Sequence, residues 1–269
     1  PVFTGLDGTP SYTEGGAAQI LDANVTIGDV ELDALNGGNG QYNGASLSLV
    51  RNGGANSQDI FSLVSGGNLT VAGGPDGGGT ISAGGNIIAN IANSGATGQL
   101  QINFVDNTTA PSRALVNEVM QAIRYSNNSN DPAANVQIDW TFSDGNSVNT
   151  QGTGSNPGTA TGSVTVGITN VSDAPSLSAT GGNPTFTEGG GAQDLFNTVT
   201  ASAVEAADRI SAMTLTVTNV SDGASEILSF DGSDVALTNG TSVNTATNGL
   251  TVNVSVAGST ATVSFTGAT

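Results

Sequence analysis

The stretch Val136-Gln-Ile-Asp-Trp-Thr-Phe142 alternates apolar and polar residues at every position. Side chains along a β-strand point alternately to two faces, so this pattern predicts a strand with one buried face. Two further segments, 163–170 and 251–256, are also predicted to be strands. Turn-forming glycine, asparagine and aspartate residues separate these short segments. The sequence therefore predicts a mostly β protein.

One segment, at about 110–124, has the helical period instead. It includes Pro111 at a position where proline is favoured, the first turn of a helix. Its apolar residues recur at helical spacing and share one face: Leu115, Val116, Val119, Met120 and Ile123. Many short strands and a single amphipathic helix predict a β-sandwich, with the helix covering one edge or end of a sheet.

An internal repeat sets the expected domain organisation. The segment Pro10-Ser-Tyr-Thr-Glu-Gly-Gly-Ala-Ala-Gln-Ile-Leu21 recurs 174 residues later as Pro184-Thr-Phe-Thr-Glu-Gly-Gly-Gly-Ala-Gln-Asp-Leu195. Self-similarity at a fixed spacing is typical of tandem arrays. We expect a linker from a preceding repeat at 1–9, repeat one at 10–173, a linker at 174–183, and an incomplete repeat two at 184–269. The chain is then expected to be a piece of a longer protein.

The charge balance excludes several classes of function. Of 269 residues, 22 are Asp or Glu and 4 are Lys or Arg, which gives a net charge of −18. All four basic residues are arginines, and the chain has no lysine, histidine or cysteine. Nucleic-acid binding, catalysis by His, Cys or Lys, thiolate or imidazole metal sites and disulfides are therefore not expected. Nor is a membrane span, because no apolar run is long enough.

What remains in quantity is carboxylate oxygen, the ligand that calcium prefers. Acidic and amide residues gather at particular points of the repeat. Glu14 and Glu188 occupy the same place in both copies, although glutamate has no special preference for turns. Aspartate and asparagine also favour turns because they cap local backbone, which is the alternative explanation for the other positions. The candidate ligands are Glu14, Asp29, Glu31, Asp33, Asp144, Asn170, Asp173, Glu188, Glu205 and Asp208.

Four motifs occur in a fixed order along the chain: Thr13-Glu-Gly-Gly16, Ala122-Ile-Arg-Tyr-Ser-Asn-Asn-Ser-Asn-Asp-Pro132, Trp140-Thr-Phe-Ser-Asp-Gly145 and Ile168-Thr-Asn-Val-Ser-Asp-Ala-Pro175. With them, essentially the whole chain resembles the cadherin-like β-sandwich repeats of very large bacterial surface and secreted proteins, such as RTX-type adhesins. The resemblance implies tandem cadherin- or immunoglobulin-like sandwiches with Ca²⁺ bound at the junctions between repeats.

The resemblance also implies roles for the candidate ligands. A junction site around Asn170 and Asp173 would take Glu14 and Asp144 from the base of repeat one. From the top of repeat two it would take Glu205 and Asp208. At the two ends that point away from the junction, the resemblance implies other ligands. Asp29, Glu31 and Asp33 would face a preceding repeat, and Glu188 would face a following one.

The function expected from these observations is that of a non-catalytic, calcium-binding structural or adhesive module of a large extracellular bacterial protein. Calcium would stiffen the array, because an ion that binds only the ordered junction stabilises it. The expected partners are neighbouring repeats of the same chain, with other copies or a cell-surface or matrix ligand as further options. A building block of an extracellular filament or surface layer is an alternative. A carbohydrate-binding or carbohydrate-active module is a weaker one, because catalytic carboxylates are not normally copied into every repeat.

Overall fold

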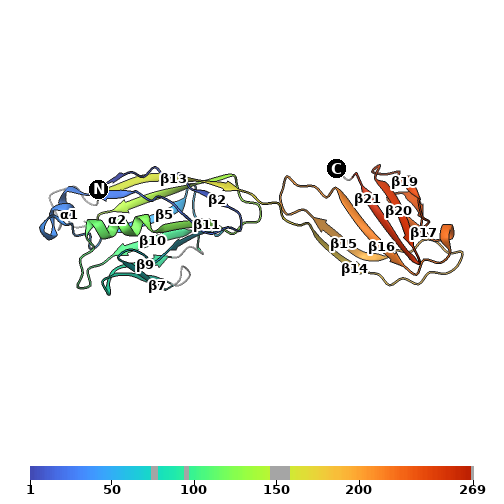
Figure 1. Ribbon diagram of the computed structural model, residues 1–269, viewed down its shortest axis with the longest axis horizontal. Coiled ribbons are helices and arrows are strands. Elements are labelled where there is room, and N and C mark those ends of the chain that lie inside the picture. Colours follow the sequence, from blue (N-terminus) through green and yellow to red (C-terminus); the bar gives the residue numbers. More distant parts are fainter. Residues whose placement is uncertain (74–77, 94–96, 146–157, 268–269) are drawn as a thin grey trace. The chain divides into compact units, whose positions relative to one another are not determined.

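A computed structural model describes residues 1–73, 78–93, 97–145 and 158–267. The chain divides into two compact units, unit 1 at Pro1–Val171 and unit 2 at Ser172–Thr269 (Figure 1). Both units are built mainly from short β-strands arranged in several sheets, so the predicted β class is confirmed.

The largest sheet of unit 1 has eight strands in the order β2-β13-β12-β5-β10-β9-β8-β7. All neighbouring strands are antiparallel except β2 and β13, which are parallel. Their bounds are β2 Ser11–Thr13, β13 Thr159–Thr169, β12 Asn135–Ser143, β5 Ser46–Arg51, β10 Gln99–Phe104, β9 Asn86–Asn93, β8 Gly79–Ala83 and β7 Leu69–Gly73.

Strand β12 confirms the alternation predicted for 136–142. Its apolar side chains Val136, Ile138, Trp140 and Phe142 are all buried. The polar positions between them are half-buried or exposed. The two aromatic rings of this face, Trp140 and Phe142, each lie 6.4 Å edge-on from the ring of Phe3.

Two smaller sheets accompany it in the described part of unit 1. Strand β1, Val2–Thr4, pairs with β4, Thr26–Gly28. Strand β11, Ile123–Asn127, lies between β3, Gln19–Ile20, and β6, Asp59–Leu63. These sheets and the eight-stranded sheet share one apolar core.

The expected helix is present and shorter than predicted. Helix α2 spans Arg113–Gln121, and the Ser112 side chain caps its first turn by accepting a hydrogen bond from the Leu115 amide. It buries Val116, Val119 and Met120. Ile123, which shares their helical face in the sequence pattern, instead opens β11.

Unit 1 also has a short helix that the sequence did not predict. Helix α1 spans Val30–Ala34, and a 3-10 turn follows at Asn36–Gly38. The Asp29 side chain caps α1 by accepting hydrogen bonds from the amides of Glu31 and Leu32. Five residues are too few to give a helical period that can be recognised in a sequence.

Unit 2 has a four-stranded antiparallel sheet in the order β16-β21-β20-β19. Within the described part of unit 2, eight buried apolar residues form the core, among them Val235, Val252 and Val263. Two strand pairs and a 3-10 turn at Gly223–Ser225 complete the unit. The bounds are β16 Ala212–Thr218, β21 Thr260–Thr266, β20 Thr251–Ala257, β19 Ser242–Asn244, β14 Ser176–Gly181, β15 Phe196–Ser202, β17 Ile227–Phe230 and β18 Ser233–Ala236.

The segments expected to be linkers contain strands. In the 1–9 segment, β1 pairs with β4 and places Phe3 against the core of unit 1. In the 174–183 segment, β14 pairs with β15 inside unit 2. The division between the units falls at 171/172. No helix of the described residues is long and apolar enough to cross a membrane.

Candidate functional site

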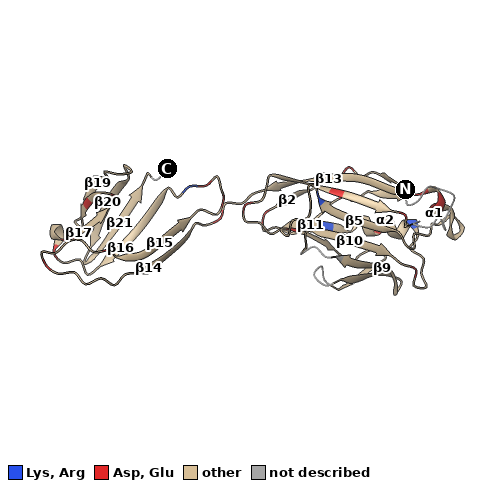
Figure 2. Ribbon diagram, turned by 180° about the vertical axis from the view of Figure 1, so that it is seen from behind, with Lys and Arg blue, Asp and Glu red and all other residues tan. Residues whose placement is uncertain are grey.

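Candidate ligands lie at the two ends of unit 1 and in one loop of unit 2, with Glu188 in a separate turn. In Figure 2, acidic residues recur in loops and at α1. The basic residues, all arginines, are few. Among the described residues, no group of three or more carboxylate side chains is already arranged around one point in the way a metal centre needs.

Glu14 lies at the end of unit 1 where β13 finishes. Its backbone amide donates to the Thr169 carbonyl at 3.0 Å, and its Oε2 atom accepts from the Val171 amide at 3.0 Å. Asn170 lies at the same end, where its Nδ2 donates to Oδ1 of Asp131 at 3.3 Å. Sequence reasoning overlooked Asp131, although it belongs to the Asn-Asp-Pro end of a quoted motif. The structure therefore brings Glu14, Asn170 and Asp131 to one end of unit 1.

Asp29 is buried beside α1, and its contacts are made within unit 1. Its Oδ2 lies 2.8 Å from the Pro1 ammonium nitrogen, and its Oδ1 caps the helix. Burial raises the pKa of Asp29, whereas the hydrogen bonds from the Leu32 and Glu31 amides help to hold it below its ordinary value. Asp29 is thus held as a carboxylate.

Asp33 has two side-chain partners and Glu31 is half-buried nearby. The Tyr42 hydroxyl donates to Oδ1 of Asp33 at 2.8 Å, and Arg113 Nη1 lies 3.2 Å from its Oδ2. Burial, together with this hydrogen bond to a carboxylate, raises the pKa of Tyr42 above its ordinary value. In the Asp-x-Glu-x-Asp pattern, Asp29 therefore caps helix α1, and Asp33 binds the side chains of Tyr42 and Arg113.

Asp144 lies at the opposite end of unit 1 from Glu14, which corrects the grouping implied by the resemblance. It follows Ser143, which pairs with Thr159, whereas the other end of β12 pairs with the end of β13 near Thr169. Nine residues of strand separate these ends by about 27 Å. Asp144 accepts hydrogen bonds from the Gly158 amide at 3.0 and 3.1 Å and is buried. A turn motif alone could not reveal to which end of the sheet it belongs.

A further group of candidate ligands lies in unit 2, where hydrogen bonds connect the segment at 172–173 with the loop at 205–208. Glu205 is 5% exposed, and its Oε1 accepts a 2.5 Å hydrogen bond from the Asp173 amide. Asp208 accepts a 3.1 Å hydrogen bond from the Ser172 hydroxyl, and its own amide donates to the Glu205 carbonyl at 3.0 Å. Three candidate ligands, Asp173, Glu205 and Asp208, are thus tied together within this unit.

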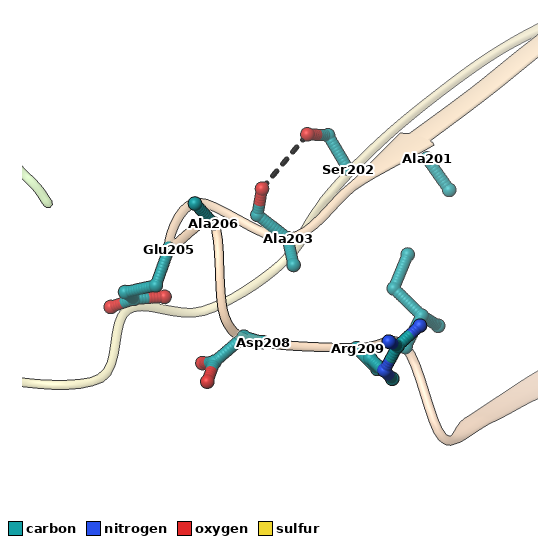
Figure 3. A pocket seen from close by; sticks show the side chains of 8 residues that line it. Ala201, Ser202, Ala203, Glu205, Ala206, Asp208 and Arg209 are labelled. Atoms are coloured by element: carbon teal, nitrogen blue, oxygen red, sulfur yellow. Dashed lines mark hydrogen bonds between the residues drawn. The ribbon is translucent and has the colours of Figure 1, made fainter. Parts of the chain in front are cut away.

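Two oxygens of this group lack partners. Among the described residues, Asp173 Oδ2 and Glu205 Oε2 are buried atoms that accept no hydrogen bond. Buried carboxylate oxygens nearly always have a partner, so an orphan calls for a water molecule or an ion. Figure 3 shows the carboxylates of Glu205 and Asp208 extending to the same side of the 203–209 loop, with Arg209 extending to the other side. An open hollow beside them is lined by 201–203, 205–206 and 208–210.

The same loop in unit 2 is not a copy of α1. Ala203 stands 174 residues after Asp29, and its methyl side chain cannot accept the hydrogen bonds with which Asp29 caps α1. The segment forms turns instead of a helix. Glu205, at the position matching Glu31, accepts a hydrogen bond from the Asp173 amide. Glu188 lies apart from this group, in an exposed turn closed by the Gly190 amide and the Thr187 carbonyl.

Sequence reasoning did not single out two buried aspartates, Asp22 and Asp59. Asp22 accepts hydrogen bonds from four backbone amides, those of residues 7, 8, 24 and 25, at 2.7–2.9 Å. Asp59 pairs with Arg51. Both are satisfied by protein groups and hold unit 1 together, so neither is a candidate ligand.

Comparison with known proteins gives no assignment. No protein-family model matches the chain, and no curated protein matches it.

Proposed function

We propose that the chain is a non-catalytic structural module that binds calcium through the carboxylates at the ends of its units. The observation that carries this proposal is the pair of buried, unpartnered oxygens Asp173 Oδ2 and Glu205 Oε2. A bound cation would supply the partner that both oxygens lack, because burying an anionic oxygen without a partner costs free energy.

The donor set of unit 2 suits a hard cation. Calcium takes six to eight oxygen ligands and tolerates variable geometry. Asp173 and Glu205 offer one unpartnered oxygen each, and the Asp208 carboxylate lies on the same side of the loop as Glu205 (Figure 3). Water completes such a shell in many calcium sites. A site with few protein ligands predicts weak affinity, on the order of 0.1–1 mM, which is the range of extracellular modules.

The consequence of binding is order at the segment that enters unit 2. The Ser172 hydroxyl and the Asp173 amide are already held by Asp208 and Glu205. Calcium at these carboxylates stabilises that arrangement by mass action and so stiffens the start of the unit. We propose that this serves a tandem, cadherin-like spacer of a large extracellular bacterial adhesin. Support for tandem repetition comes from the 174-residue repeat and from matching strand registers in the two units.

The test is to follow thermal unfolding of the full chain with and without calcium, in parallel with Glu205→Gln. At calcium ten times the Kd, unit 2 should gain about 1.4 kcal/mol. Glu205→Gln should abolish this gain. Without calcium it should be no less stable than the parent chain, because it removes a buried negative charge that has one oxygen without a partner.

Asp234→Asn is the matched control, since it removes one exposed negative charge from the same unit. It should keep the calcium gain. Equal calcium stabilisation in Glu205→Gln and the parent chain would contradict the assignment. So would a parent chain that does not respond to calcium at 10 mM, which is above the expected Kd range.

A further inference from the structure

The chain carries six Asn-Gly pairs, a dipeptide in which the asparagine side chain can react with the backbone that follows it. The pairs begin at Asn36, Asn39, Asn43, Asn52, Asn239 and Asn248. In this reaction the glycine nitrogen attacks the side-chain Cγ of the asparagine and closes a five-membered succinimide ring. Glycine permits the approach because it has no Cβ and restricts the backbone least. Which pairs react therefore depends on whether the glycine amide is free in the folded chain.

In four of the six pairs, the glycine amide already donates a backbone hydrogen bond, with nitrogen–oxygen distances of 2.9–3.2 Å. The donors and their acceptors are Gly40 and Leu35, Gly44 and Phe104, Gly240 and Val254, and Gly249 and Thr245. An amide that is bonded in this way keeps its proton and stays away from the asparagine side chain until the local structure opens. These four pairs are therefore protected by the fold.

The other two pairs, Asn36-Gly37 and Asn52-Gly53, lie in exposed turns of unit 1. Among the described residues, the amides of Gly37 and Gly53 have no hydrogen-bond acceptor. The space beside them is open as well, because a Cβ atom placed on either glycine would meet nothing within 4 Å beyond its chain neighbours. Solvent can therefore take the amide proton, and no distant group blocks the nitrogen from approaching Cγ.

The contacts of Asn52 leave this approach possible. Its turn is closed by the Gly54 amide, which donates to the Arg51 carbonyl at 3.0 Å, so the Gly53 amide between them takes no part. The Asn52 side chain donates through Nδ2 to Oδ2 of Asp139 at 2.9 Å. Water competes for both groups of this exposed contact, so it restrains the side chain only weakly.

We propose that Asn36 and Asn52 are sites of spontaneous deamidation in the folded protein. A solvent base removes the glycine amide proton, the nitrogen forms a bond to Cγ, and the bond from Cγ to Nδ2 breaks. The released nitrogen takes up a proton from solvent and leaves as ammonia. Water then opens the succinimide at one of its two carbonyls and gives aspartate or isoaspartate. At Asn52, the aspartate product places a carboxylate beside Asp139, so a like-charge pair replaces a hydrogen bond next to the end of β5.

The test follows deamidation of the full chain in mildly alkaline buffer, with each site assigned by tandem mass spectrometry of its peptides. Asn36 and Asn52 should gain the mass of one deamidation about tenfold faster or more than Asn39 and Asn43, whose glycine amides must first be released by local opening. All four lie in unit 1, so a difference in stability between the units does not enter the comparison.

Two controls accompany this measurement. In the same chain unfolded in urea, the four rates should become similar, because no glycine amide is then held. In the folded Asn52→Gln variant, the mass gain at position 52 should be lost while Asn36 still reacts. Glutamine at this position would have to close a six-membered ring, which forms more slowly.

Similar rates at all four positions of the folded chain would overturn the proposal, since bonded amides would then offer no protection. So would a rate order that is the same in urea as in the folded chain, because the local sequence would then determine it. Slow reaction at either Asn36 or Asn52 would overturn the assignment of that residue. Fast reaction at both, with a difference from Asn39 and Asn43 that disappears in urea, supports the proposal.

Discussion

At the scale of single residues, Asp59 shows what a carboxylate needs in order to be buried. Its side chain is fully buried, yet both oxygens are bonded: Arg51 Nε and Nη2 each lie 2.6 Å away. The Tyr125 hydroxyl donates at 2.6 Å and Asn127 Nδ2 at 3.0 Å. Burial and the hydrogen bond to Asp59 raise the pKa of Tyr125 above its ordinary value. Asp173 and Glu205 each keep one buried oxygen without a partner, and this contrast separates a structural carboxylate from a candidate ligand.

Replacing Asp59 tests how much this cluster stabilises unit 1. Asp59→Asn leaves the Arg51 charge without its counter-ion, so unit 1 should lose about 3–5 kcal/mol. The fluorescence of Trp140, the single tryptophan of the chain, reports urea unfolding of unit 1. Asp106→Asn, which removes an exposed charge from the same unit, should change stability by no more than about 0.5 kcal/mol. Equal effects of the two substitutions would show that the ion pair is dispensable.

The residue scale is also where sequence reasoning reached its limit. Asp22, Asp59 and Asp144 look alike in the sequence, and each lies near turn-forming residues. What distinguishes Asp59 is contact with Tyr125 and Asn127, residues 66 and 68 positions away. Local pattern holds no information on such distant partners. Glu14 was found because it recurs with its repeat, and the position-by-position offset also placed Glu205.

At the scale of elements, prediction succeeded where the period was long enough to read. Strand β12 has nine residues and α2 has nine, and both carry a clear apolar face. Strand β1 has three residues, too few to show alternation, and its partner β4 lies more than twenty positions away. Helix α1 depends on a single cap, Asp29. Short elements that depend on distant partners or on one side chain therefore escaped prediction.

Helix α2 should be held in place mainly by its buried face. Met120 is fully buried in the core of unit 1, so Met120→Ala removes apolar contacts and leaves a cavity. We expect a loss of about 2–5 kcal/mol in the free energy of unfolding, measured by Trp140 fluorescence in urea. Val30→Ala truncates an apolar residue of α1 that is 85% exposed, and it should change stability by no more than about 0.5 kcal/mol. A Met120→Ala loss as small as that of Val30→Ala would mean that α2 is peripheral.

At the scale of the whole molecule, the two units differ in the size of their cores. Among the described residues, 32 buried apolar residues form the core of unit 1 and eight form that of unit 2. Burial of apolar surface is the main favourable term in folding, so unit 2 is expected to be much the less stable unit.

This difference predicts two unfolding transitions. Far-UV circular dichroism reports strands of both units, whereas Trp140 fluorescence reports unit 1 alone. On heating, circular dichroism should show an earlier transition, from unit 2, that is silent in fluorescence. Calcium should move this earlier transition upward. Coincident curves from both probes would mean that the chain unfolds as one cooperative body.

The parallel pairing of β2 with β13 has a mechanical consequence. Ser11, Tyr12 and Thr13 pair with Gly167, Ile168 and Thr169, so a strand near the start of unit 1 lies alongside its last strand, in the same direction. Tension that pulls the two ends of unit 1 apart draws β2 and β13 in opposite directions along their length. The backbone hydrogen bonds between the two strands are then all loaded in shear at the same time and cannot break one after another. The pairing of β2 with β13 therefore resists stretching of unit 1 along the chain.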